Sequence, residues 1–123
     1  MAAPESSEHG VAFDLGAIER ELTQQEAYRH EGHTARTLVL APDLRVVLVT
    51  LKGGSRIAEH HANESTSIHA VSGHVRVHLR DRTVDLPAGW ILVLARGLEH
   101  HVEATIDSAF VLTLGWTTVA GAA

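Results

Sequence analysis

The sequence predicts an all-β protein, an antiparallel sandwich or barrel with one short helix near the N-terminus. Short apolar segments alternate with turn residues along most of the chain, and no helical pattern separates them. Apolar residues make up 45% of the sequence but aromatic residues only 4%, so Val, Leu, Ile and Ala must build the core. A chain of 123 residues has room for one compact domain and too little for two.

One amphipathic segment predicts the helix. Asp14 is a suitable N-cap, and apolar side chains then recur at helical spacing through Leu15, Ile18 and Leu22. We expect a helix of a few turns over residues 14–25 that covers one end of the barrel. Its role is packing, because the segment carries no pattern of reactive residues.

The chain divides into three parts. We expect residues 1–12 to form a flexible arm, residues 13–118 a single domain and residues 119–123 a frayed tail. The first ten residues lack the basic and apolar regions of a secretory signal, and no apolar run has the length of a membrane span. These features predict a cytoplasmic protein.

Nine strands are expected after the helix, each bounded by Gly, Pro, Asp or Ser turns. The alternation is clearest in residues 74–80, where valines and a leucine share one face and His74, Arg76 and His78 share the other. We expect that polar face to lie in solvent. The nine segments are residues 34–40, 45–51, 55–61, 67–71, 74–80, 83–86, 90–94, 100–104 and 109–116.

Composition excludes several function classes. A formal net charge of −5 argues against a nucleic-acid or anionic-membrane partner. The chain has no cysteine, which excludes disulfides, thiolate metal sites and a cysteine nucleophile. Neither a G-x-S-x-G elbow nor a phosphate-binding loop is found. Histidine is over-represented, with ten residues, and any metal would have to be bound by His, Asp, Glu or water.

Adjacent histidines occur twice, as His60-His61 and as His100-His101, each pair following a glycine turn. Side chains alternate along a strand, so regular strands turn only one histidine of each pair into the barrel. If the two pairs meet in space, they form the functional centre.

The first histidine stretch resembles the first signature motif of the cupin family, G-x5-H-x-H-x(3,4)-E-x6-G. Gly54, His60 and Gly73 match this pattern, whereas Ala62 and Thr66 occupy the positions of the second histidine and the glutamate. Cupins are small β-barrels of the jelly-roll kind, and the resemblance spans roughly residues 45–116.

The second stretch resembles the second cupin motif, G-x5-P-x-G-x2-H-x3-N. Gly89, Gly97 and His100 match, and Ala95 and Ala104 stand at the proline and asparagine positions. The two resemblances together imply a cupin-type double-stranded β-helix, in a small single-domain bacterial protein that forms a homodimer.

The resemblance also implies a central pocket lined by His60, Thr66, Trp90 and His100. Trp90 stands where an aspartate usually follows the glycine. Of the four positions that bind metal in a typical cupin, only His60 and His100 are retained. By motif position these two face inward, and His61 and His101 lie on the other face or at the barrel mouth.

Two interpretations of the pocket stay open. In the first, one divalent transition metal (Zn, Fe, Ni or Mn) is held by His60 and His100 with His61 or Glu64, which requires a β-bulge or an inward swing of the loop. In the second, the pocket is metal-free, and its histidines bind a ligand or move a proton near pH 7.

We therefore expect a small-molecule-binding cupin whose specific activity the sequence leaves undefined. One alternative is a metal-dependent enzyme, dioxygenase-like or isomerase-like, that acts on a small polar or acidic metabolite. A second is a non-catalytic structural or sensing dimer. Outside the pocket, His30 and His33 are expected at the surface and His69 toward a dimer partner or water. Arg56 is a candidate for binding an anion if it reaches inward.

Overall fold

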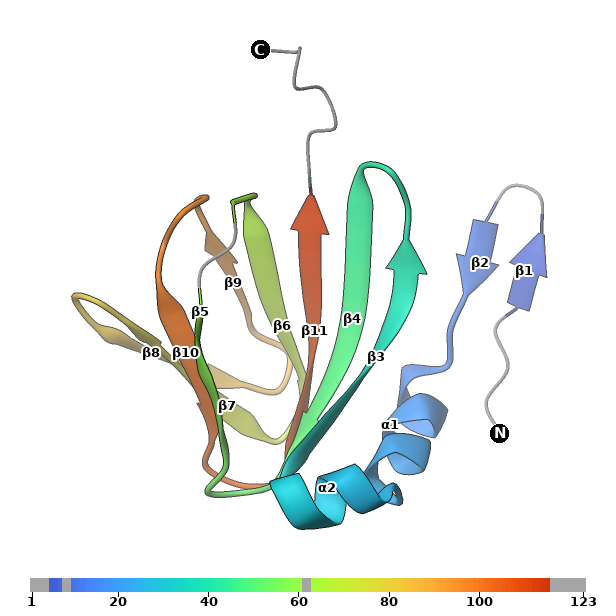
Figure 1. The fold of residues 1–123 in the computed structure, drawn as a ribbon, viewed down its shortest axis with the longest axis horizontal. Helices are drawn as coiled ribbons and strands as arrows, with labels where there is room; N and C mark the ends of the chain where they lie inside the picture. The colour runs from blue at the N-terminus through green and yellow to red at the C-terminus, as the bar shows by residue number, and fades with distance from the viewer. Residues whose placement is uncertain (1–4, 8–9, 61–62, 116–123) are drawn as a thin grey trace.

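The larger part of the molecule is a pair of antiparallel sheets that face each other (Figure 1). The structure is a computed structural model, and it describes residues 5–7, 10–60 and 63–115. One sheet has five strands in the order β3-β4-β11-β6-β9, and the other has four in the order β5-β10-β7-β8. The all-β prediction is confirmed.

All nine predicted strands are present, and no boundary differs from the prediction by more than one residue. The larger sheet contains β3 (His33–Leu40), β4 (Leu44–Leu51), β6 (Thr66–Ser72), β9 (Ile91–Leu94) and β11 (Ser108–Gly115). The smaller sheet contains β5 (Arg56–His60), β7 (His74–Leu79), β8 (Thr83–Pro87) and β10 (His100–Ala104).

Two helices lie at one end of the larger sheet (Figure 1). The predicted helix is α1 (Leu15–Thr23), and Asp14 caps it by accepting a 3.1 Å hydrogen bond from the Ala17 amide. A second helix, α2 (Glu26–Glu31), follows and was not predicted. Its six residues carry one buried side chain, Tyr28, which is too few for a helical apolar period to be visible. Neither described helix is long and apolar enough to cross a membrane.

The N-terminal segment contains regular structure where we expected a flexible arm. Strands β1 (Glu5–Ser7) and β2 (Gly10–Ala12) pair with each other in antiparallel register. The three residues of β2 are exposed, so this strand buries no apolar side chain. A period-two apolar pattern is therefore missing from its sequence. The expected tail, residues 119–123, lies outside the described residues.

The larger sheet is buried on both faces in its centre. On β4, Val47 and Val49 face the second sheet and belong to the main core, whereas Leu48 faces α1. Ile18 and Leu22 of α1 complete that second cluster. Burial on both faces explains why β4 reads as a continuous apolar run rather than as an alternating one.

A close approach between two turns explains the glycine of the β6–β7 turn. Gly73 has a φ of 74°, and a Cβ at this position would lie 2.3 Å from both Asp107 O and Ser108 Oγ. No side chain fits there, and L-residues rarely adopt this backbone conformation. Ser108 Oγ accepts a hydrogen bond from the His74 amide at 2.9 Å and so ties the two turns together.

Candidate functional site

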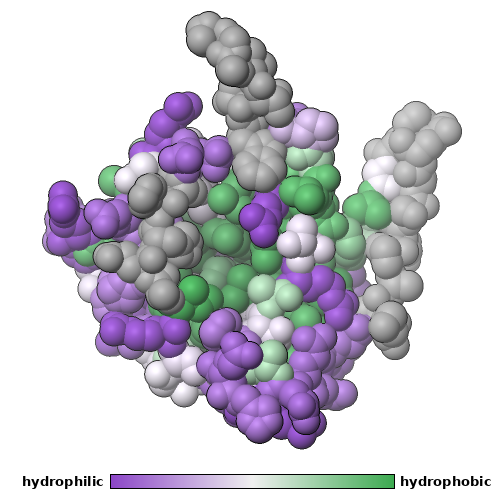
Figure 2. Space-filling model, in the orientation of Figure 1, coloured by the Kyte–Doolittle hydropathy of each residue, from purple (hydrophilic) through white to green (hydrophobic). Residues whose placement is uncertain are grey.

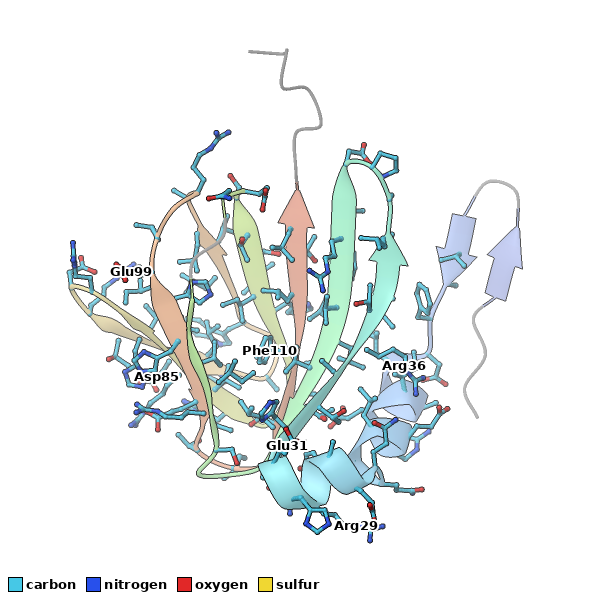
Figure 3. The ribbon with its side chains drawn as sticks, viewed as in Figure 1. Arg29, Glu31, Arg36, Asp85, Glu99 and Phe110 are labelled. Carbon is cyan, nitrogen blue, oxygen red and sulfur yellow. The ribbon has the colours of Figure 1, made fainter. Side chains whose placement is uncertain are left out.

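The space between the two sheets contains a cavity of about 560 Å³. Its wall is mostly aliphatic, with residues such as Val47, Ile68 and Leu112 and one aromatic ring, Phe110, among the described lining. In Figure 3, Phe110 lies between the two sheets, and Figure 2 shows apolar side chains near the centre of the same view. This size and apolar character suit a small-molecule site.

Five polar residues interrupt the apolar wall: His33, Arg45, Asn63, Glu64 and His100. His33 and His100 are the first residues of β3 and β10, Arg45 is the second residue of β4, and Asn63 and Glu64 belong to the loop before β6. Ends of strands and loops are where polar groups can enter a barrel without breaking its apolar centre. The polar groups of the cavity are thus positioned by three strands and one loop and not by one motif.

His100 brings a basic nitrogen to this cavity. The residue is only 2% exposed, and its Nδ1 lies 3.2 Å from the carbonyl oxygen of Leu98. A carbonyl accepts hydrogen bonds and cannot donate, so Nδ1 carries the proton of the neutral ring and Nε2 carries the lone pair. Nε2 is buried. His100 can therefore accept a proton or a hydrogen bond at Nε2.

The backbone places His60 opposite His100. The two residues are register partners in the β5–β10 pair, and the register shifts before the next pair, Val102 with Ile57. Three positions of β5 therefore span two of β10, which is a β-bulge on the N-terminal side of His60. The side chain of His60 and the whole of His61 lie outside the described residues. Their roles as pocket residue and ligands remain predictions.

The other predicted site residues lie in different surroundings. Glu64 lines the cavity. Thr66 is buried, and its Oγ1 donates a 3.2 Å hydrogen bond to the carbonyl oxygen of Glu64. Trp90 is 61% exposed in the turn between β8 and β9 and is not part of the cavity wall. The prediction that Trp90 lines the pocket is corrected: the turn at Gly89 carries it to the surface.

Three polar cavity residues were missed in the sequence: Asn63 in the loop before β6, His33 and Arg45. His33 was expected at the surface, yet it begins β3, one residue before the predicted start, and its Nδ1 is buried. Arg45 was counted only as the first residue of an apolar strand. It shares the parity of Val47 and Val49, both of which line the cavity. This alternation was a signal that could have identified Arg45.

The described residues supply too few ligands for a metal ion. Nowhere in the described part of the chain do three or more His, Asp or Glu side chains come together as a metal-binding group. His100 and Glu64 alone fall short of the three or four protein ligands that a transition metal usually has. The described donors therefore do not fit a metal site.

The outer face of the smaller sheet carries a second group of polar residues. Arg56, Glu103, Arg76 and Asp85 follow one another across β5, β10, β7 and β8, with alternating charge. Arg76 Nε donates to Asp85 Oδ1 at 2.9 Å, and His74 Nε2 donates to the same oxygen at 3.1 Å. These two bonds, the one from His74 first, lower the pKa of Asp85.

The histidine after His100 belongs to this outer face. The rings of His101 and His78 stack with centroids 4.5 Å apart, and Arg56 Nη2 donates to His101 Nε2 at 3.1 Å. His78 Nε2 donates to Glu103 Oε1, and this bond lowers the pKa of Glu103. Arg56 lies on the exposed side of the sheet, so the candidate anion-binding role that depended on its reaching inward is corrected.

Comparison with known proteins gives the fold a name. No protein-family model matches the chain, and no curated protein is similar to it in sequence. A cupin-2 domain protein from Shewanella frigidimarina is similar in structure with a TM-score of 0.68 at 17% identity, covering 85% of this chain and 94% of its own. A conserved protein of unknown function from Streptococcus pyogenes reaches 0.70 at 21%, covering 97% and 98%.

A mutant salicylate 1,2-dioxygenase from Pseudoaminobacter salicylatoxidans reaches a TM-score of 0.75 at 20% identity. The match covers 85% of this chain but only 34% of the dioxygenase. Two facing antiparallel sheets, the strand order and these structural likenesses agree with one another, and the chain has the cupin fold.

Proposed function

We propose that this protein binds a small molecule in the cavity between its two sheets, with His100 as the group that accepts a hydrogen bond or a proton from it. The observation that carries the proposal is a buried imidazole in a cavity of about 560 Å³. The Leu98 carbonyl holds Nδ1 protonated, so Nε2 is the reactive nitrogen. His60 is the backbone register partner of His100 in the β5–β10 pair, and we propose His60 as the second histidine of the site.

Structural similarity to salicylate 1,2-dioxygenase supports a catalytic version of this function. Salicylate 1,2-dioxygenase carries the same fold over the matched third of its length. We propose that the chain, if it is an enzyme, acts on a small metabolite through His100. A bound metal held by His60, His61, Glu64 and His100 is the alternative form of the site.

A thermal-shift screen with a matched pair of histidine variants tests the proposal. A ligand that binds the folded state raises the melting temperature as its concentration increases. We expect hits among small aromatic and aliphatic compounds. Those hits that form hydrogen bonds should bind His100→Gln more weakly than wild type. Binding to His101→Gln, which is changed on the outer face, should be the same as to wild type. Leu112→Trp narrows the cavity and should abolish binding while the protein stays folded. Equal binding by wild type and folded Leu112→Trp would contradict a cavity site.

The metal alternative has its own measurement. Protein purified without a tag is analysed for metal content and then melted with added Fe, Mn, Ni or Zn. A stoichiometric metal, or a rise in melting temperature that His100→Gln removes, supports a metal centre. A metal content below about a tenth of an equivalent, with no rise, rejects it.

The homodimer and the cytoplasmic location belong to the same proposal. Sedimentation of the purified protein tests the first, and fractionation of cells tests the second. A monomer at micromolar concentration would contradict the homodimer.

A further inference from the structure

Two residues that line the cavity each have a side-chain nitrogen that is buried without a hydrogen-bond partner in the described structure: Arg45 at Nε and His33 at Nδ1. Both residues belong to the β3–β4 pair, in which Arg45 opposes Leu40 and His33 opposes Leu51. Six positions of β4 therefore separate them, which is about 20 Å along the strand. One small ligand group cannot contact both, so each must be considered by itself.

Arg45 differs from the arginines with bonded side chains elsewhere in the structure. Arg36 pairs with Glu21 at 3.2 Å, Arg76 bonds Asp85, and Arg56 bonds His101. Arg56 and Arg76 are exposed, where water would also satisfy them, and Arg36 is half-buried like Arg45 but has an acidic partner. Arg45 is partly buried, and its Nε is removed from solvent without a partner. A buried donor on a charged group without a partner is unfavourable, so the position indicates a group kept for something that binds.

The chemistry of the Arg45 guanidinium defines the ligand group that it would bind. The guanidinium is always protonated, and its Nε–H and an adjacent Nη–H form a fork that matches the two oxygens of a carboxylate. Leu114 is the register partner of Arg45 in β11, and both line the cavity. Beyond them the wall continues as Val47 and Leu112. A ligand held by Arg45 therefore places its anionic end at the start of β4 and its carbon skeleton against aliphatic side chains.

The other charges of the cavity limit the ligand to a single negative charge. Arg45 is its one permanent cation among the described residues, and Glu64 adds a carboxylate to the same wall. No ion pair joins Glu64 to Arg45 in the described structure, so Arg45 is not neutralised from within. A phosphate dianion would require more donors and would be repelled by Glu64.

From these observations we infer that Arg45 is the binding residue for a small monocarboxylate with an apolar body, which is the ligand class of the cavity. This inference rests on the proposed function, because it requires that the cavity is the binding site. It adds the charge and the orientation of the ligand: the carboxylate lies at Arg45 and the apolar part between the sheets.

Titration calorimetry with matched probes tests the inference. Benzoate is compared with benzamide, and hexanoate with hexanamide, because each pair shares its shape and differs in charge; phenyl phosphate is the dianion. The proteins are wild type, Arg45→Gln, Arg45→Lys and, as the matched control, Arg82→Gln in the exposed β7–β8 turn. Melting curves without ligand establish that each variant is folded.

We expect wild type and Arg82→Gln to bind at least one acid about tenfold to a hundredfold more tightly than its amide. Arg45→Gln should remove that preference, Arg45→Lys should restore part of it, and phenyl phosphate should bind more weakly than benzoate. The inference is overturned if folded Arg45→Gln retains the preference, if phenyl phosphate binds more tightly than benzoate, or if acid and amide bind wild type equally. Equal binding leaves the proposed function intact, whereas failure of every acid and amide to bind folded wild type at millimolar concentration overturns both.

Discussion

The cavity and the outer face of the smaller sheet both contain histidine and arginine, but among the described residues the cavity arginine lacks the hydrogen-bond partners that the outer-face residues have. On the outer face, His78 contacts Glu103, Thr83 and the ring of His101. In the cavity, Arg45 Nε is buried without a partner in the described structure. Figure 3 shows the two regions on either side of the sheet, with Phe110 inside and Asp85 outside.

This difference separates structural histidines and arginines from candidate functional ones. Outer-face groups satisfy one another, so their role is explained by the fold. We expect a partly buried cation such as Arg45 to lower the stability of the free protein, and such residues concentrate where a ligand supplies the missing partner. The presence or absence of a bonded partner among the described residues, rather than residue type, therefore distinguishes Arg45 from the arginines of the outer face. His100 and His101 are adjacent in sequence and belong to opposite regions.

The largest effect should come from the apolar wall. Phe110 is 2% exposed and packs in the main core, so Phe110→Ala should lower the free energy of unfolding by about 3–5 kcal/mol. Urea denaturation measures the change, and His101→Ala on the outer face is the control with a much smaller loss. A loss under about 1 kcal/mol for Phe110→Ala would show that the ring is not part of the core that separates the two regions.

A smaller effect is expected on the outer face. His78→Ala removes the ring stack and both side-chain hydrogen bonds, and should lower the free energy of unfolding by about 1 kcal/mol. A double-mutant cycle with Glu103→Gln isolates the His78–Glu103 contribution. If the changes in unfolding free energy of the two substitutions are strictly additive, the His78–Glu103 pair contributes nothing to stability. The outer face would then not have the structural role assigned to it.

Arg45 should behave in the opposite way. Without ligand, Arg45→Met should leave the stability unchanged or raise it by up to about 1 kcal/mol, because it removes a buried cation that has no partner. Arg76→Met, which breaks the bond to Asp85, should lower stability slightly. Thermal unfolding of both variants makes the comparison. A clear destabilisation by Arg45→Met would indicate that Arg45 is structural.

The smallest effect concerns pH. The pKa values of Asp85 and Glu103 are lowered below the ordinary values of 3.8 and 4.5 by hydrogen bonds from His74 and His78. A lowered folded pKa stabilises the protein above the ordinary pKa, and this contribution is lost as pH falls through the folded value. The melting temperature should therefore decline below about pH 4.5. The Asp85→Asn, Glu103→Gln double variant should show a shallower decline between pH 5 and 3; an identical decline would refute the assignment.

The strands and the partition of their faces were predictable because both depend on local alternation. Residues 74–80 were expected to turn valines inward and His74, Arg76 and His78 outward, and Val75 and Val77 are indeed fully buried. Helix α1 was predictable from its cap and apolar spacing. Helix α2 was not, because its only buried side chain, Tyr28, depends on contact with neighbouring elements.

What the sequence determined by itself is therefore the all-β fold, the strand boundaries, α1 and the resemblance to cupins through two glycine and histidine patterns. Only the tertiary structure decided that His33 lines the cavity, that Trp90 lies outside it, and that the β5 bulge precedes His60. The face on which a side chain lies follows from alternation within one strand, whereas a cavity forms only where two sheets pack against each other. Whether a polar side chain has a partner depends on residues distant in sequence, and that is settled when the sheets pack.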